Sequence, residues 1–334
     1  MKTGTLCPGC ERGRETRHRV NVGCPIGGAS SAGGESRSCR LYCLQGVLLA
    51  LVALGGLLVP RVVAGSSASA VAAGQSHACA VTSGGALVCW GHNNRGQLGD
   101  GTTETRLTPV AVSGLESGVG AVFAGGEHTC ALTSGGAVLC WGYNGYGQLG
   151  DGTTANRLTP VAVSGLASGV VAVVVGRNHT CALTSAGAVR CWGWNGNGQL
   201  GDGTPSNRST PVEVTGLGSG VIAVAAGEQH TCAVTSGGAV QCWGRNSSGQ
   251  LGDGTTTNRL TPVAVSGLGS GVVAVVGGGL HTCAVTSGGA VLCWGWNDSG
   301  QLGDGTRGTD RLTPVAVSGL GRGVIAVAAG YNHT

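Results

Sequence analysis

Short apolar runs alternate with clusters of Gly, Ser, Thr and Asn from about residue 65 onward, and one arrangement of them recurs along the chain. In one unit Val170–Val175 is a continuous apolar run rich in β-branched residues, as expected for a strand buried on both faces. Cys181–Thr184 and Ala188–Trp192 flank a Ser-Ala-Gly turn, which predicts a hairpin with a three-residue loop. Pro211–Val214 alternates and begins with proline, as an edge strand does. Four short antiparallel strands without a helical period predict a propeller blade.

Six histidines mark the period of this repeat. They are His77, His128, His179, His230, His281 and His333, spaced by 51 residues and, in the last interval, by 52. Repeats of this length are typical of propellers or solenoids. The sequence therefore predicts an all-β fold, a β-propeller of four-stranded blades, over residues 65–334. The units are about 68–116, 117–167, 168–218, 219–269 and 270–321, with a partial unit at 322–334 that supplies only a first strand, Val324–Ala329. We expect a piece of a larger propeller, the alternative being closure with fewer blades.

Composition and charge separate the two ends of the chain. The 67 glycines follow no Gly-X-Y period, which favours many tight turns over collagen. Residues 1–64 hold eight Lys or Arg and three acids, a net charge of +5, whereas the remainder holds 11 Arg and 12 acids, a net charge of −1. A nucleic-acid partner is not expected, because binding of that kind needs basic residues clustered on the folded part.

The first 64 residues divide into two segments. Residues 41–64 contain an apolar run from Leu41 to Val59 that follows two arginines and precedes Val62-Val63-Ala64, and this predicts a signal peptide. A retained membrane anchor is the alternative, because the run is nearly long enough to span a bilayer. Residues 1–40 are expected to be an unstructured or mis-assigned leader, although Cys7-Pro8-Gly9-Cys10 resembles half of a zinc knuckle. The protein is therefore expected to be secreted or on the cell surface.

Two cysteines with nine residues between them occur in every complete unit. In the predicted hairpin with a loop at Ser134–Gly136, Cys130 faces Cys140 within disulfide reach. Export would supply an oxidising compartment. We therefore predict five disulfides within blades rather than zinc sites: Cys79 with Cys89, Cys130 with Cys140, Cys181 with Cys191, Cys232 with Cys242, and Cys283 with Cys293.

Other chemically capable residues recur in every unit, which argues against catalysis, since a catalytic group is needed only once. The histidines are expected to hydrogen-bond a neighbouring loop, with a metal-binding ring of histidines as the less favoured reading. The aspartates of Gly-Asp-Gly are expected to close turns, with the nearby arginines as partners, and the tryptophans to pack between blades. No catalytic residue, metal or cofactor is therefore predicted.

Residues that differ between units gather in two loops, which a meander brings to one end of each blade. The loop after Trp-Gly carries the candidate binding residues His92, Tyr143, Trp194, Arg245 and Trp296, with Arg95, Tyr146 and Asn197 nearby. The loop before the histidine carries Gln75, Glu127, Arg177, Glu228 and Leu280, of which Arg177 joins the candidates. Variation on one face of a repeat protein often marks its binding face, and Trp, Tyr and Arg are enriched at interaction hot spots.

The recurring phrases Gly-x-x-His-Thr, Trp-Gly-x-Asn-x-x-Gly-Gln-Leu-Gly-Asp-Gly and Thr-Pro-Val resemble the regulator of chromosome condensation repeat family from Ala68 to Thr334. The resemblance implies a propeller, usually of seven blades. Some eukaryotic members exchange nucleotide on a small GTPase, an activity not expected of an exported protein. The phrasing is also similar to exported bacterial propellers, including a β-lactamase inhibitor protein, although the paired cysteines depart from the eukaryotic pattern. We therefore expect an exported, non-catalytic scaffold for a protein partner, with glycan binding and a propeller lyase or hydrolase as alternatives.

Overall fold

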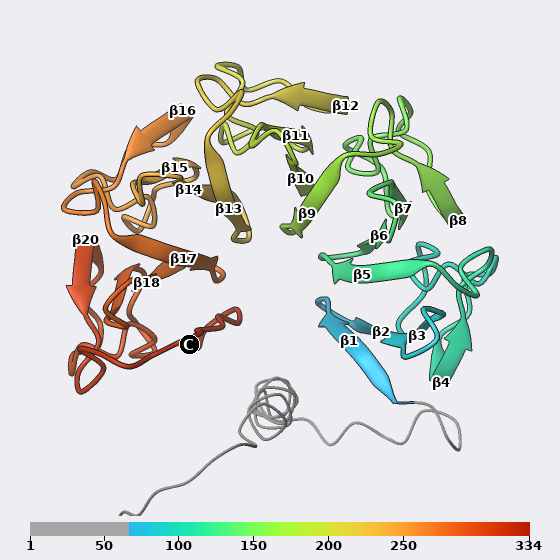
Figure 1. Cartoon of the computed structure of the whole chain (residues 1–334), viewed down its shortest axis with the longest axis horizontal. Helices are drawn as coiled ribbons and strands as arrows, with labels where there is room; N and C mark the ends of the chain where they lie inside the picture. The colour runs from blue at the N-terminus through green and yellow to red at the C-terminus, as the bar shows by residue number, and fades with distance from the viewer. Residues whose placement is uncertain (1–66) are drawn as a thin grey trace, which may run out of the picture. The chain divides into compact units, whose positions relative to one another are not determined.

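Each repeat folds into one four-stranded antiparallel sheet, here called a blade. The structure is a computed structural model that describes residues 67–334. In all five sheets the strands lie side by side in chain order, as in β1-β2-β3-β4. The blades follow one another around a common centre, with the first strand of each innermost (Figure 1). The predicted blade architecture is confirmed, and the strand that carries Thr-Pro-Val lies at the outer edge, where a missing N–H costs least.

Blades 1 to 5 are built from strands with nearly constant bounds. The innermost strands are β1 (Ala68–Ala73), β5 (Val119–Ala124), β9 (Val170–Val175), β13 (Val221–Ala226) and β17 (Val272–Gly277). The second strands are β2 (His77–Thr82), β6 (His128–Thr133), β10 (His179–Thr184), β14 (His230–Thr235) and β18 (His281–Thr286). The third strands are β3 (Leu87–Gly91), β7 (Val138–Gly142), β11 (Val189–Gly193), β15 (Val240–Gly244) and β19 (Val291–Gly295). The outer strands are β4 (Arg106–Ala111), β8 (Arg157–Ala162), β12 (Arg208–Glu213), β16 (Arg259–Ala264) and β20 (Arg311–Ala316).

The partial sixth unit, residues 322–334, does not form its predicted strand. Residues 324–329 are not strand, because no ladder pairs them with a neighbour. Val324 and Val327 nevertheless pack against the apolar cluster of blade 5 that contains Leu302 and the disulfide of that blade. The N–H of Val324 also donates to the carbonyl of Gly289 at 3.0 Å. The segment therefore docks on blade 5 without the ladder that would define a strand.

A disulfide joins the second and third strands in the middle of every blade. Cys181 faces Cys191 in the β10–β11 register, and their Cα atoms lie 4.1 Å apart. Gly136 has φ of 79° in the corresponding turn of blade 2, a left-handed conformation that glycine adopts without steric cost. The turn thus sets the register that places the two sulfur atoms in reach of each other. The same geometry joins the other predicted pairs: Cys79 to Cys89, Cys130 to Cys140, Cys232 to Cys242, and Cys283 to Cys293.

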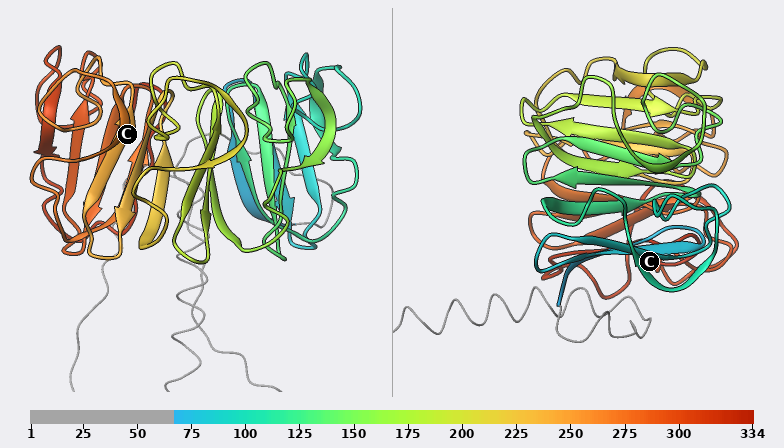
Figure 2. Two further views of the ribbon diagram at one scale, coloured as in Figure 1. Left: turned by 90° about the horizontal axis from the view of Figure 1, so that it is seen from above. Right: turned by 90° about the vertical axis from the view of Figure 1, so that its right-hand side faces the viewer.

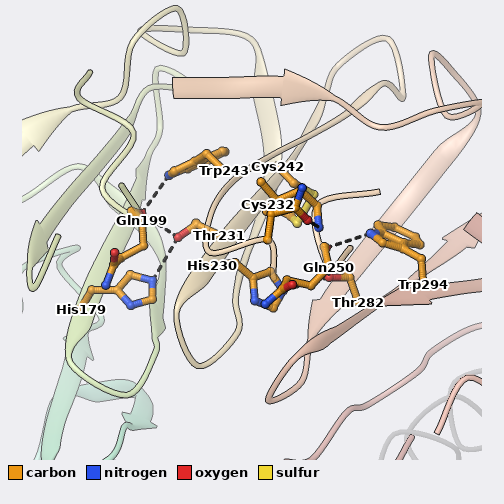
Figure 3. The surroundings of a disulfide bond; sticks show 12 residues. His179, Gln199, His230, Thr231, Cys232, Cys242, Trp243, Gln250, Thr282 and Trp294 are labelled. Carbon is orange, nitrogen blue, oxygen red and sulfur yellow. Dashed lines mark hydrogen bonds between the residues drawn. A yellow bond between two sulfur atoms is a disulfide. The ribbon is translucent and has the colours of Figure 1, made fainter. Parts of the chain in front are cut away.

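Neighbouring blades are held together by a repeated polar link. At the boundary of blades 3 and 4, His179 Nε2 lies 3.0 Å from Thr231 Oγ1, whose hydroxyl donates to the carbonyl of Gln199 at 2.9 Å (Figure 3). The indole N–H of Trp243 donates to that same carbonyl at 2.9 Å. Equivalent links join blades 1 and 2, 2 and 3, and 4 and 5. The histidine partner is therefore a threonine at the start of the next blade's second strand, not a loop as expected from the sequence.

In blades 1 to 4 this link determines the hydrogen position on the histidine. Because the threonine's only hydrogen points at the glutamine carbonyl, its oxygen must accept from Nε2–H. The Nδ1 atom of the same ring is then a bare acceptor, and it is buried without a hydrogen-bond partner among the described residues. Burial, together with neighbouring histidines, lowers the pKa of His128, His179 and His230 to about 3. The pKa values of His77 and His281 fall to about 4 for the same reasons.

Four of the five repeat tryptophans pack between blades, as predicted, whereas Trp90 of blade 1 is half-buried. Trp141, Trp192, Trp243 and Trp294 are fully buried, and each lies in the apolar cluster of the preceding blade. Gly201 lies against the indole of Trp243 and has a φ of 70°. A Cβ at this position would lie 2.8 Å from Trp243 Nε1. The first glycine of Gly-Asp-Gly is therefore needed both for its conformation and for the close approach of the indole.

The substitution Thr231→Val is expected to lower the free energy of unfolding by about 1–3 kcal/mol, because the buried Nε2–H of His179 loses its acceptor while the shape is kept. Chemical denaturation measures the change. Thr210→Val is the matched control, since Thr210 is exposed on β12. Equal stability of the two variants would show that the link contributes nothing.

The expectations for the N-terminal part concern residues outside the described range: the leader over 1–40 with its zinc alternative, and the signal peptide or anchor over 41–64. Between residues 67 and 334, no helix is long and apolar enough to cross a bilayer.

Candidate binding site on the loop face

The two variable loops of each blade meet at one end of the sheet, here called the loop face. They are the short loops between the first and second strands (74–76, 125–127, 176–178, 227–229 and 278–280) and the long loops between the third and outer strands (92–105, 143–156, 194–207, 245–258 and 296–310). The first residue of each long loop donates its N–H to the short loop of the same blade, as Tyr143 does to the carbonyl of Glu127 at 2.9 Å. Figure 2 shows the strands of each blade running between the loop face and the opposite end, where the hairpin turns lie.

Buried amides hold the long loops in one conformation. In blade 2 the fully buried Asn144 accepts from the N–H of Leu149 at 3.0 Å and donates to the carbonyl of Thr153 at 3.1 Å. Gln148, also fully buried, accepts from the N–H of Tyr146 at 3.0 Å. Their counterparts make the same contacts in the other blades. The residues exposed between these anchors are therefore held on a rigid frame.

Each long loop is closed by an ion pair, as predicted from the sequence. Arg157 lies 2.7 Å from Asp151, and equivalent pairs join Arg106, Arg208, Arg259 and Arg311 to the aspartates of their own blades. Burial alone would raise the pKa of Asp151, but hydrogen bonds from Thr153 and Arg157 outweigh it and hold that pKa below its usual value. The aspartates thus stay ionised and structural, consistent with their recurrence in every blade.

A chain of aromatic contacts crosses three blades on the loop face. The guanidinium carbon of Arg95 in blade 1 lies 5.3 Å from the ring centre of Tyr143 in blade 2. The rings of Tyr143 and Tyr146 pack edge to face, with 5.9 Å between their centres. The centre of the Tyr146 ring lies 6.3 Å from that of Trp194 in blade 3. All three rings are half-buried. We call Arg95, Tyr143, Tyr146 and Trp194 the aromatic cluster; it unites four candidate residues that lie up to 99 positions apart in the chain.

Charged residues of the short loops border this cluster. Arg95 lies 3.7 Å from Glu127, and Arg177 lies 2.7 Å from the largely buried carboxylate of Glu228. The hydrogen bond from Arg177 to Glu228 raises the pKa of that guanidinium further. Burial and the neighbouring Tyr146 raise the pKa of Tyr143, so the Tyr143 hydroxyl keeps its hydrogen at neutral pH.

The remaining candidates take different positions. His92 accepts a 3.5 Å contact from the Gln97 amide and lies beside the cluster in a shared pocket. Arg245 donates to Gln229 at 3.1 Å, and the same oxygen accepts from Asn197 at 3.0 Å. Trp296 lies in the equivalent loop of blade 5 and has no aromatic contact among the described residues. The candidates thus do not form one cluster, and Trp194 and Trp296 are separate features.

Glu127 and Asn178 belong to the site although neither was among the candidates. Both line the pocket that Arg95, Tyr143 and Arg177 enclose. Glu127 varies between repeats, as Gln75 and Arg177 do, so its signal was present in the sequence. Asn178 carries the same signal, because it stands directly before the histidine, the repeat position that Glu127 holds in blade 2 and that Ser76, Gln229 and Leu280 hold in blades 1, 4 and 5. Over residues 67–334 no group of His, Cys, Asp or Glu is arranged to hold a metal ion.

Comparison with known protein families identifies the repeat. Five consecutive segments match the model described as the Regulator of chromosome condensation (RCC1) repeat, at residues 84–132, 135–183, 186–234, 237–285 and 288–334. The chain belongs to the RCC1 repeat family. Each of the first four RCC1 matches starts in the hairpin turn of one blade and ends in the second strand of the next, so the sequence repeat is offset from the blade by half a sheet.

Similarity to individual proteins supports this RCC1 assignment. The chain is 37% identical over 254 residues to the ultraviolet-B receptor UVR8 of Arabidopsis thaliana, covering 75% of this chain and 58% of that protein. It thus spans little more than half the length of that relative. The solved structure of human WBSCR16 superposes with a TM-score of 0.70 at 25% identity, covering 80% of this chain and 70% of that one. Prp20p of Saccharomyces cerevisiae, which has binding properties toward Gsp1p and histones, superposes with a TM-score of 0.69 at 23% identity, covering 80% of this chain and 67% of that one.

Proposed function

We propose that the chain is an exported, non-catalytic scaffold that engages a protein partner through the loop face of blades 1 to 3. The observation that carries the proposal is the aromatic cluster, in which Arg95, Tyr143, Tyr146 and Trp194 touch one another across blade boundaries on rigid loops. Rings that are already ordered lose little conformational entropy when a partner covers them. Tyr, Trp and Arg are also the residue types that dominate interface energies.

The family supports a binding role in general. RCC1 propellers serve as protein-interaction scaffolds, and yeast Prp20p binds Gsp1p and histones. The rest of the proposed surface follows the candidate residues: His92 and Arg177 border the cluster, while Arg245 and Trp296 extend the face toward blades 4 and 5. The proposal assigns no partner from a relative to this chain, because the chain spans only 58% of UVR8 and is only 23% identical to Prp20p.

A non-catalytic role is supported by how the recurring groups are used. The histidines bind threonines of the next blade, the aspartates bind arginines of their own loop, and the cysteines bind each other. Each recurring group that could act as acid, base or nucleophile in the described blades therefore has a structural partner. Export is supported by the five disulfides, which persist in oxidising compartments, and by the signal peptide expected over residues 41–64.

Site-specific photo-crosslinking tests the proposal. With benzoylphenylalanine in place of Tyr146, the exported protein should capture a defined partner from its native surroundings, and Arg95→Ala with Trp194→Ala should abolish that capture. The matched position is Ser185, exposed in the turn at the opposite end of blade 3, where no capture is expected. Equal capture at the two positions, or capture at Ser185 alone, would refute the loop face as the binding surface.

A further inference from the structure

A polar pocket lies beside the aromatic cluster, where the loops of blades 1, 2 and 3 meet. Its volume is about 330 Å³, and His92, Arg95, Glu127, Tyr143, Tyr146 and Arg177 line it together with smaller polar residues. This volume is at the lower end of the range of about 300–1,000 Å³ for small-molecule sites. The pocket is therefore sized for one compact group rather than an extended chain.

The charges around the pocket cancel. Arg95 has Glu127 as its counterion at 3.7 Å, and Arg177 has Glu228 at 2.7 Å. An anionic ligand would compete with these two carboxylates, and a cationic ligand would be repelled by both guanidinium groups. The pairing therefore favours a ligand without net charge.

Hydrogen-bonding groups of both kinds point to a ligand rich in hydroxyls. Arg95 and Arg177 supply N–H donors beyond those used in their ion pairs, and Glu127 supplies carboxylate acceptors. The hydroxyls of Tyr143 and Tyr146 can do either. The Gln97 amide donates to Nδ1 of His92, which assigns the ring hydrogen to Nε2 and adds another donor. A hydroxyl group both donates and accepts, so a ring that carries several of them matches this mixture.

The aromatic rings supply the apolar contact that such a ligand also needs. Tyr143 and Tyr146 form part of the wall, and both rings remain partly accessible. Tyr and Trp side chains combine an apolar face with a polar edge. A pyranose ring has the complementary character, with C–H groups on its faces and hydroxyls at its rim.

We propose that this pocket is a subsite for a single neutral sugar ring. The inference goes beyond the proposed function: it shares the loop face but does not depend on a protein partner. Glu127 would accept from ring hydroxyls, Arg95 and Arg177 would donate to them, and one of the two tyrosine rings, which stand perpendicular to each other, would pack against the C–H face.

Saturation-transfer NMR with the full chain tests the assignment. The probes are glucose, mannose, galactose and N-acetylglucosamine, with glutarate and lysine as charged probes of similar size. At least one sugar should receive saturation from the protein, and the charged probes should not. Glu127→Gln and Tyr143→Phe should each weaken that sugar's binding roughly tenfold, since each removes a hydrogen-bonding group.

The control is Glu213→Gln, the same chemical change at an exposed position on the outer strand of blade 3, which should leave sugar binding intact. The assignment is overturned if no sugar in the panel binds, if glutarate or lysine binds instead, or if the Glu127 variant binds as the control does. Partner capture at position 146 with no sugar binding would sink only the sugar subsite, and the reverse result only the protein partner.

Discussion

Reduction of the five blade disulfides is expected to remove about 7–14 kcal/mol from the free energy of unfolding. Each bridge joins cysteines separated by 10 positions, as Cys79 and Cys89 are, and closing so short a loop stabilises the native state by at most about 2.8 kcal/mol on the chain-entropy model. The lower figure allows for hairpins that already restrict the unfolded chain. The loss is comparable to the whole stability of a typical domain, about 5–15 kcal/mol. Guanidinium denaturation with and without dithiothreitol measures it.

A single blade provides the control for this prediction. Cys232→Ala with Cys242→Ala removes the bridge of blade 4, shown in Figure 3, and should lower stability by about 1–3 kcal/mol under oxidising conditions. The variant should have a correspondingly smaller response to dithiothreitol. Identical denaturation midpoints with and without reductant, in protein shown to carry free thiols, would contradict a stabilising role for the bridges.

Acidification is expected to unfold the propeller between about pH 4 and 5.5 because five repeat histidines, four of which link neighbouring blades, are buried in the neutral form. Their pKa values are about 3 to 4 in the folded chain, against 6.5 for an ordinary histidine. Below pH 6.5 the unfolded chain therefore binds more protons than the folded one, and stability falls as pH falls. Each histidine contributes a slope of about 1.4 kcal/mol per pH unit until the folded pKa is reached. Circular dichroism across a pH series follows the transition.

The substitution His128→Gln separates this effect from a general loss of packing. Glutamine does not titrate, so the variant should lose stability at pH 8 but show a pH dependence shallower by about 1.4 kcal/mol per pH unit. If wild type and variant have the same slope between pH 6.5 and 4, the histidines do not control acid stability.

The blade itself could be predicted from the sequence, because everything that defines it is local. The run Val170–Val175, the Ser-Ala-Gly turn and the facing Cys181 and Cys191 all lie within one unit, and their spacing fixes both strand pairing and disulfide register. The recurrence of Trp192 next to the cysteines also sufficed to place it between blades. Each of these inferences needed only the period of a strand and the length of a turn.

The contacts between blades could not be predicted in the same way. His179 and Thr231 are 52 positions apart, and either residue alone is compatible with many partners. The aromatic cluster depends on the angle between blades 2 and 3, which brings Tyr146 close to Trp194. The repeat period in the sequence does not determine this angle. The same limit explains why Trp194 and Trp296 looked alike in the sequence but occupy separate parts of the loop face.

Hydrogen exchange on the chain with and without its captured partner measures most directly where that partner lies. Binding through the loop face predicts added protection in segments 92–95, 143–146 and 177–178, with little change in the hairpin turns 83–86, 134–137 and 185–188. Protection confined to those turns, or to the outer strands, would contradict it.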